Sequence, residues 1–205
     1  MDPVILKKAR LALARRDGVL KPIIRTVGPC TLKANGDAFE VLVRSIISQQ
    51  ISTKAAIAIG GRVLQTVGKF QPRRILAAAD DDLRSAGLSR GKLLSLRDLA
   101  TKCIDGTVPL KKLDAMPDDE VSATLTQVRG IGPWTAEMFL IFCLGRPDVL
   151  PAGDYGLRAG VQKQYALADL PNKGALTDLA ECWKPYRSIG TWYIWRSLGG
   201  VPQSE

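Results

Sequence analysis

The segment Val128–Ala136, Val-Arg-Gly-Ile-Gly-Pro-Trp-Thr-Ala, contains the residues best suited to binding an anion. Glycine tolerates positive φ and leaves the backbone bare, so Gly130 and Gly132 would let a phosphate oxygen approach closely. Pro133 favours the first turn of a helix, and the amides at a helix N-terminus attract anions. The segment therefore predicts a phosphate site. The alternative is an ordinary turn between helices, because Gly-x-Gly by itself is common.

A carboxylate follows this turn, because Asp154 lies 22 residues after Gly132 in the stretch Leu-Pro-Ala-Gly-Asp-Tyr-Gly-Leu-Arg. Taken alone, Asp154 is a favourable N-cap for a following helix. A carboxylate can also stabilise positive charge that develops during a reaction, or orient and deprotonate a water molecule. The sequence contains no histidine, so any chemistry must proceed without an imidazole base or an imidazole metal ligand.

The composition favours a nucleic-acid partner. Lys and Arg number 29 against 20 Asp and Glu, which gives a formal charge of +9, and an excess of this sign suits a polyanion. The four cysteines lie far apart with no Cys-x-x-Cys pair. This spacing predicts reduced thiols, with no zinc site, iron–sulfur cluster or disulfide framework. No apolar run is long enough to span a membrane and no signal peptide is evident, so we expect a cytoplasmic protein.

Helical periodicity dominates the chain and predicts an all-α fold. Residues 3–16 pair apolar positions with a basic face, residues 37–48 carry one apolar stripe, and Ser52 can cap a third helix. Further helices are expected near 71–79, 80–87, 90–104 and 117–127, and the last four begin at 133, 154, 173 and 187. The Gly- and Pro-containing stretch 145–153 is expected to be a linker.

The string Val128–Ala136 resembles the helix-hairpin-helix signature of the DNA glycosylase superfamily that includes DNA-3-methyladenine glycosylase II. In that family the turn binds a DNA phosphate, often with a monovalent cation held by main-chain carbonyl groups. The resemblance implies the following DNA-backbone contacts: Gly130, Ile131, Gly132, Trp134, Thr135 and Arg158. A sodium or potassium ion would be bound by the carbonyl oxygens of Thr126, Val128 and Gly130.

The resemblance also implies that Asp154 is the catalytic carboxylate. The family carries its aspartate after the hairpin, at the start of a helix, and Gly153 stands where some relatives have a second acid. Relatives with lyase activity have a lysine just after the hairpin glycines, where this chain has Trp134. We therefore expect hydrolysis that leaves an abasic site without strand cleavage. The cysteines of the iron–sulfur branch are missing, so no such cluster is expected.

Two further segments resemble family elements. Residues 44–56 resemble the segment that fills the gap left by a flipped base, with Gln50 the best candidate wedge and Gln49 more structural. As an alternative, both glutamines are solvated loop residues. Residues 183–195 resemble the alkylation-repair branch, and electron-rich rings there would stack on a cationic base. The predicted base pocket consists of Trp195, Trp134, Met138 and Tyr193, although Trp192 and Tyr193 are alternatively core residues.

The resemblance covers residues 37–198 and predicts a two-lobed helical bundle with an active-site cleft between the lobes. Residues 37–145 would form a middle lobe with the helix-hairpin-helix at about 118–143, and residues 1–36 plus 146–205 a second lobe. The expected function is monofunctional removal of alkylated purines, especially 3-methyladenine, from double-stranded DNA by a monomer. The alternatives are a non-catalytic DNA-binding module with the same hairpin, or a glycosylase for oxidised or mismatched bases.

Overall fold

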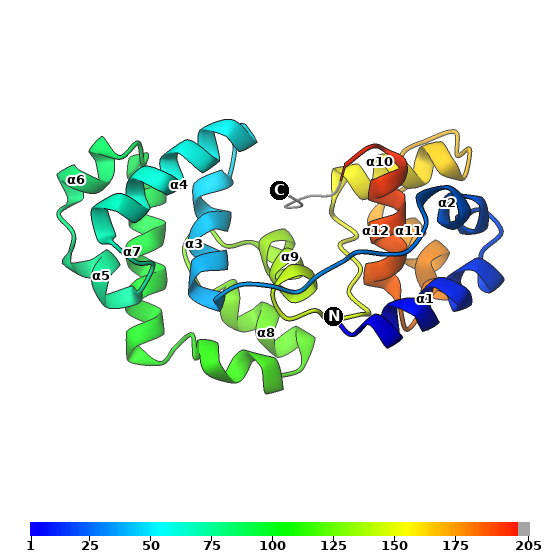
Figure 1. Cartoon of the computed structure of the whole chain (residues 1–205), viewed down its shortest axis with the longest axis horizontal. Helices are drawn as coiled ribbons and strands as arrows, with labels where there is room; N and C mark the ends of the chain where they lie inside the picture. The colour runs from blue at the N-terminus through cyan, green and yellow to red at the C-terminus, as the bar shows by residue number, and fades with distance from the viewer. Residues whose placement is uncertain (201–205) are drawn as a thin grey trace. The chain divides into compact units, whose positions relative to one another are not determined.

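The computed structural model describes residues 1–200, and every regular element in that range is a helix, as the sequence predicts (Figure 1). The chain forms two compact units. One consists of Gly36–Phe139, and the other combines Met1–Asn35 with the chain from Leu140 onward. Within residues 1–200, no helix combines the length and apolarity that a membrane span requires.

The unit Gly36–Phe139 is built around α7, which packs against α3, α5 and α6, while α4 packs against α3. Its helices are α3 (Ala38–Ser48), α4 (Thr53–Val67), α5 (Pro72–Ala77), α6 (Asp80–Ser85), α7 (Arg90–Asp105), the 3₁₀ helix η1 (Leu110–Ala115), α8 (Asp118–Leu125) and most of α9 (Pro133–Phe142). Apolar side chains from α3 and α7 form the centre of its core. These include Leu42, Ile46, Leu96 and Leu99, all fully buried.

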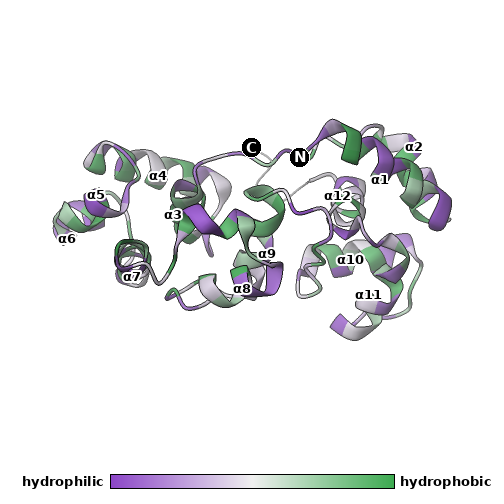
Figure 2. Cartoon of the chain, turned by 90° about the horizontal axis from the view of Figure 1, so that it is seen from below, coloured by the Kyte–Doolittle hydropathy of each residue, from purple (hydrophilic) through white to green (hydrophobic). Residues whose placement is uncertain are grey.

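The second unit is built around α12, which packs against α1, α2 and α10. Its elements are α1 (Pro3–Arg16), α2 (Leu20–Val27), α10 (Tyr155–Gln164), α11 (Lys173–Leu179), η2 (Ala180–Trp183) and α12 (Arg187–Ser197). Every residue of α12 from Ser188 to Trp195 is buried. Helix α1 instead carries both hydrophobic and hydrophilic residues (Figure 2), and its buried residues Ala9 and Leu13 lie four positions apart, on one face.

Polar N-caps explain where many of the helices begin. A side-chain oxygen accepts a hydrogen bond from an amide of the first turn, which satisfies a donor that has no partner inside the helix. The residues that do so are Asp2, Asp37, Ser52, Ser89, Asp154 and Asn172. The sequence predicts Ser52 as a cap, and its hydroxyl does accept from the amide of Ala55.

Helix α2 is an element that the sequence pattern does not predict. It is only eight residues long, too short for a clear period, and Pro22 lies in its first turn, where proline is tolerated. Asp17 begins it, because Oδ1 of that residue accepts hydrogen bonds from the amides of Val19 at 2.9 Å and Leu20 at 3.0 Å.

The boundary between the units differs from the predicted one. The sequence predicts that the middle lobe ends at residue 145, whereas the unit ends at Phe139, within α9. The last residues of α9 belong with the other unit because they contact it directly. The ring of Phe142 stacks on Trp195, with centroids 6.0 Å apart, and its carbonyl oxygen accepts the amide of Asn35 at 3.0 Å.

Asp17 is a buried carboxylate, 6% exposed, between α1 and α2. Its Oδ2 accepts hydrogen bonds from the indole N–H of Trp183 at 2.7 Å and from the hydroxyl of Tyr165. Burial and the bond to Asp17 raise the pKa of Tyr165, so this hydroxyl keeps its proton and remains a donor. One carboxylate therefore joins the α1–α2 corner to α10 and η2.

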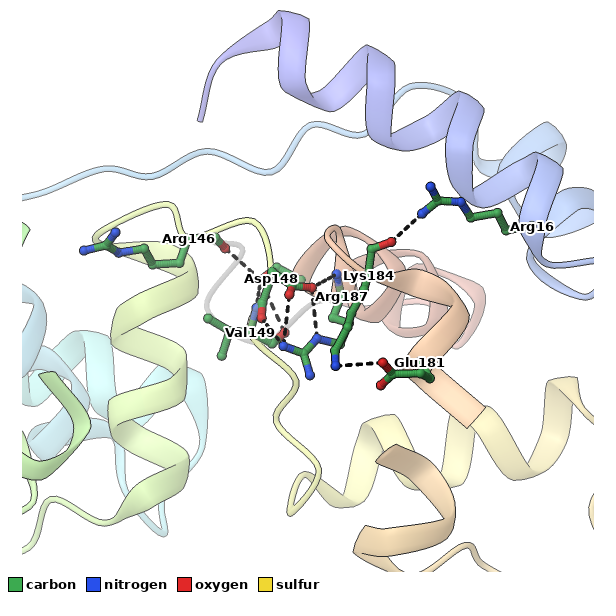
Figure 3. A network of polar contacts seen from close by, with 8 residues as sticks. Arg16, Arg146, Asp148, Val149, Glu181, Lys184 and Arg187 are labelled. Carbon is green, nitrogen blue, oxygen red and sulfur yellow. Dashed lines mark hydrogen bonds and ion pairs between the residues drawn. The ribbon is translucent and has the colours of Figure 1, made fainter. Parts of the chain in front are cut away.

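The segment before Asp154 is fixed to the start of α12 (Figure 3). The guanidinium of Arg187 binds both carboxylate oxygens of Asp148, at 2.9 and 3.0 Å. The hydroxyl of Ser188 donates to the carbonyl of Arg146 at 2.7 Å and accepts the amide of Val149 at 2.9 Å. Bidentate pairing of arginine with a carboxylate restrains both groups, so the predicted linker is held in place close to Asp154.

Asp17→Ala is expected to lower the free energy of unfolding by about 3–5 kcal/mol, because buried donors lose a charged acceptor. Urea denaturation followed by tryptophan fluorescence measures the change. Asp2→Ala, which removes the exposed N-cap of α1, is the control and should cost about 1 kcal/mol. A loss for Asp17→Ala no larger than that of the control would contradict this role.

Candidate active site

The predicted anion-binding turn joins α8 to α9, and its two glycines differ. Gly130 has φ +78°, and a Cβ atom there would lie 2.7 Å from Oγ of Ser95. Gly132 does not have positive φ, so of the two glycines only Gly130 uses this conformation. A Cβ atom at Gly132 would meet no atom within 4 Å. Gly130 is therefore required by the fold, whereas Gly132 leaves open space beside the first turn of α9.

The other predicted backbone contacts divide into exposed and buried residues. Trp134 is 40% exposed in the first turn of α9, but Ile131 and Thr135 are only 4% and 5% exposed. The amide of Ile131 donates to the carbonyl of Val128 at 3.0 Å, so it serves the turn itself. The side chains of Ile131 and Thr135 thus belong to the core, and a contact of these residues with the DNA backbone stays a prediction.

The loop between α3 and α4 contacts this turn through Gln49. Its Nε2 donates to the carbonyl of Gly130 at 2.9 Å, which gives Gln49 the structural place expected for it. Gln50 is exposed and has φ +58°, a conformation that costs a non-glycine residue about 1–2 kcal/mol. Strained residues of this kind concentrate at functional sites.

Two of the three carbonyl groups predicted to bind a cation already accept hydrogen bonds. The oxygen of Gly130 accepts from Gln49 and that of Val128 accepts from the amide of Ile131. A carbonyl oxygen has two lone pairs, so these hydrogen bonds leave both oxygens able to bind a sodium or potassium ion. The ion stays a prediction.

Asp154 caps α10, as its position before a helix predicts, and it also belongs to a polar cluster. Its Oδ1 accepts hydrogen bonds from the amide of Leu157 at 2.6 Å and the indole N–H of Trp195 at 3.0 Å. The carboxylate is only 8% exposed. Trp195 is itself held, because its ring stacks on Phe142 at an interplanar angle of 17°. The carboxylate is therefore oriented by two donors that cannot easily move.

The structure changes the predicted base pocket. Met138 and Tyr193 are fully buried, and the hydroxyl of Tyr193 donates to the carbonyl of Gly28 at 3.0 Å, with burial raising the pKa of this tyrosine. Both are core residues, which corrects their assignment to a pocket. Trp195 is 2% exposed, and its indole N–H donates to Asp154. Trp134 is therefore the most accessible of the four residues predicted to form the base pocket.

Arg158, the predicted phosphate contact after Asp154, is half-buried. Its Nε donates to the carbonyl of Pro171 at 2.7 Å. The guanidinium on α10 therefore holds the segment that contains Pro171, just before α11, through a hydrogen bond. Its other N–H groups are the ones that a phosphate contact would require, and that contact stays a prediction.

Sequence reasoning missed two residues beside Asp154. Tyr155 is 72% exposed, the most exposed aromatic side chain among residues 1–200. A Cβ atom at Gly156 would lie 3.2 Å from Oδ1 of Asp154 and 3.8 Å from Nε1 of Trp195, so glycine avoids crowding the carboxylate. The dipeptide Tyr-Gly directly after a capping aspartate was the available signal.

The four cysteines, all within residues 1–200, form no disulfide. Burial raises the pKa of Cys30 to about 11 and that of Cys103 to about 12, which keeps both protonated near neutral pH. In the part of the chain that the structure describes, no three His, Cys, Asp or Glu residues gather in a way that could hold a metal ion.

Comparisons with known proteins agree on one family. A model described as HhH-GPD superfamily base excision DNA repair protein matches residues 43–185. DNA-3-methyladenine glycosylase 1 of Schizosaccharomyces pombe is 34% identical over 94% of this chain and 87% of its own length.

Solved structures give the same result. The 3-methyladenine DNA glycosylase Mag1 of the same yeast, in complex with abasic DNA, has a TM-score of 0.83 at 32% identity and covers 97% of this chain and 100% of its own. A DNA-3-methyladenine glycosidase from Bacillus halodurans has a TM-score of 0.84 at 36% identity, over 92% and 87%.

Alanine substitutions should separate the roles of the two glycines. Gly130→Ala is expected to lower the free energy of unfolding by about 1–3 kcal/mol because of its φ and the contact with Ser95. Gly132→Ala should change it by less than about 0.5 kcal/mol, yet weaken binding of duplex DNA, since the methyl group would occupy the open space. Denaturation and fluorescence anisotropy measure the two effects. Unchanged affinity in Gly132→Ala would refute the anion site.

Proposed function

This chain belongs to the HhH-GPD superfamily of base excision DNA repair proteins, and we propose that it is a monofunctional DNA glycosylase for alkylated purines such as 3-methyladenine. The names of its relatives support this substrate class. The observation that carries the catalytic part is Asp154, a nearly buried carboxylate held by Leu157 and Trp195.

The proposed reaction is hydrolysis of the bond between C1′ of the sugar and the nitrogen of the base. As this bond breaks, its electrons leave with the base and positive charge develops on the sugar, which the carboxylate of Asp154 stabilises. A water oxygen then bonds to C1′, and the water proton passes to Asp154 or to the released base. An alkylated purine is already cationic and leaves readily, so the lack of histidine is no obstacle.

DNA binding is assigned to the unit Gly36–Phe139. Gly130 and Gly132 let a phosphate oxygen approach the first amides of α9, which suits contact with the DNA backbone and carries no sequence preference. Gln50 would fill the gap left by the flipped base, and its exposure and strained backbone support this role. Tyr155 and Trp134 are both exposed, and either aromatic ring would stack on a cationic base.

The remaining parts of the proposal concern the surroundings of the reaction. A sodium or potassium ion at Thr126, Val128 and Gly130 would add positive charge beside the phosphate. We propose that the protein acts as a monomer on damaged duplex DNA in the cytoplasm, at the nucleoid.

Asp154→Asn tests the catalytic assignment. Asparagine keeps an oxygen that can accept from Leu157 and Trp195 but removes the charge, so we expect release of 3-methyladenine from methylated duplex DNA to fall at least about 100-fold. Binding to a duplex with an abasic-site mimic should persist. Asp2→Asn, the same change at the N-cap of α1, is the control and should keep the wild-type rate.

Chromatography of the released bases gives the rates. Substantial base release by Asp154→Asn would refute the assignment. No release by the wild type from a panel of lesion-bearing duplexes would instead favour a non-catalytic DNA-binding module.

The absence of a lyase step gives a separate prediction. Trp134 stands where an amine nucleophile would be required to form a covalent imine with C1′. Borohydride added during the reaction should therefore trap no protein–DNA adduct, and the strand should stay intact until alkali is added. A trapped adduct on a denaturing gel would revive the alternative of a glycosylase for oxidised or mismatched bases.

A further inference from the structure

Helix α7 presents a polar face to both loops that are assigned to DNA. The residues of this face, called here the α7 row, are Lys92, Ser95, Asp98 and Lys102. Their spacing of three and four positions puts them on one side of the helix. Neither the proposed chemistry nor the proposed DNA contacts uses any of them.

The first residue of the α7 row supports the wedge loop. Nζ of Lys92 donates to the carbonyl of Ile47 at 2.7 Å, in the last turn of α3 and two residues before Gln49. Cations are favourable at the C-terminus of a helix, where carbonyl groups lack partners. Burial lowers the pKa of Lys92, so the protein accepts a desolvation penalty to keep an ammonium group at this place.

The other three residues support the hairpin turn. Ser95 lies against Gly130, since a Cβ atom there would come within 2.7 Å of the hydroxyl oxygen of Ser95, which itself donates to the carbonyl of Gly91. Asp98 accepts the amide of Arg129 at 2.7 Å and the ammonium of Lys102 at 2.8 Å.

The ammonium of Lys102 also donates to the carbonyl of Gln127 at 2.6 Å. Although burial acts to raise the pKa of Asp98, its hydrogen bonds to Lys102 and Arg129 lower it overall. The carboxylate is therefore charged at neutral pH.

A third link joins the two loops directly, because Gln49 donates to the carbonyl of Gly130. The wedge loop and the turn are about 80 residues apart in sequence, yet both are bonded to the same helix and to each other. Charged groups supply most of these bonds, and such bonds are stronger and more directional than neutral ones. The arrangement restrains the position of each loop relative to the other.

We propose that the α7 row is a positioning element, which fixes the hairpin turn relative to the Gln50 loop so that phosphate binding and filling of the base gap occur together. This inference rests on the proposed function of both loops. It assigns no contact with DNA to the row itself.

Lys102→Met and Lys92→Met test the proposal, one at each end of the row. Two readouts are needed: affinity for undamaged duplex DNA, and the fluorescence of 2-aminopurine opposite an abasic site, which reports insertion at the gap. We expect both variants to lose about 10-fold in affinity, the effect of one bond from a charged group, and also to lose the insertion signal. Lys102→Arg, which keeps the charge, should retain part of the affinity and part of the insertion signal.

Lys112→Met on η1 is the matched control, since it removes one exposed lysine from the same unit. It should keep the insertion signal. The salt dependence of affinity in Lys102→Met should not differ from that of the control, whereas a lysine that touched phosphate itself would reduce the slope by about one. Thermal unfolding confirms that the variants are folded, and Asp98→Asn replaces any that are not.

The proposal is overturned if both readouts stay within threefold of the wild type, or if each variant changes only the readout of the loop that it touches. A wild-type protein that binds DNA but releases no base would refute the proposed glycosylase. The binding and insertion readouts would still test the α7 row in that case.

Discussion

The burial of α12 is the constraint on which the proposed catalytic site depends. An indole N–H inside a protein must find an acceptor, and for Trp195 that acceptor is Oδ1 of Asp154. Because α12 is buried from Ser188 to Trp195, it cannot shift to let this carboxylate move. Its first turn holds the segment before Asp154, and its last turn holds Asp154 itself. The same helix thus restrains the carboxylate from two directions, which is the preorganisation that charge stabilisation requires.

The unit Gly36–Phe139 relies on a different principle. Its functional parts are loops, whose backbone groups cannot all be satisfied within a helix. Side chains of α7 and of Gln49 satisfy several of them, at Ile47, Gln127, Arg129 and Gly130. These bonds add to the apolar packing of the hairpin, in which Val128 and Ile131 are buried. Charged side chains on one helix therefore restrain the hairpin in addition to its apolar packing.

Much of the architecture was predictable because local rules govern it. Caps such as Ser52 and Asp154 and the apolar stripe of α3 gave the helices and their starts. Helix α2 was missed because its start depends on Asp17. This carboxylate is held by hydrogen bonds from Tyr165 and Trp183, which are far away in the sequence. A single sequence does not reveal such pairs.

The site residues show the same division. Gly130 and Asp154 stood out because the strings around them resemble those of a known family, whereas Asp154 by itself looked like an ordinary N-cap. Met138 and Tyr193 were misassigned because an aromatic or apolar residue on a helix has the same spacing whether it lines a pocket or fills the core, and only their full burial decides. Tyr155 was overlooked for the opposite reason, since exposure depends on how α10 packs.

The division of the chain into a continuous unit and a discontinuous one has a consequence for synthesis on the ribosome. Gly36–Phe139 emerges as one piece and can fold as soon as it is complete, since domains fold as units during synthesis. Met1–Asn35 must wait, because Asp17 finds Tyr165 and Trp183 only 148 and 166 residues later. Trp195, which holds Asp154, is made later still. A chain that stalls before α12 would therefore carry a finished hairpin without an ordered carboxylate, and could occupy DNA without repairing it.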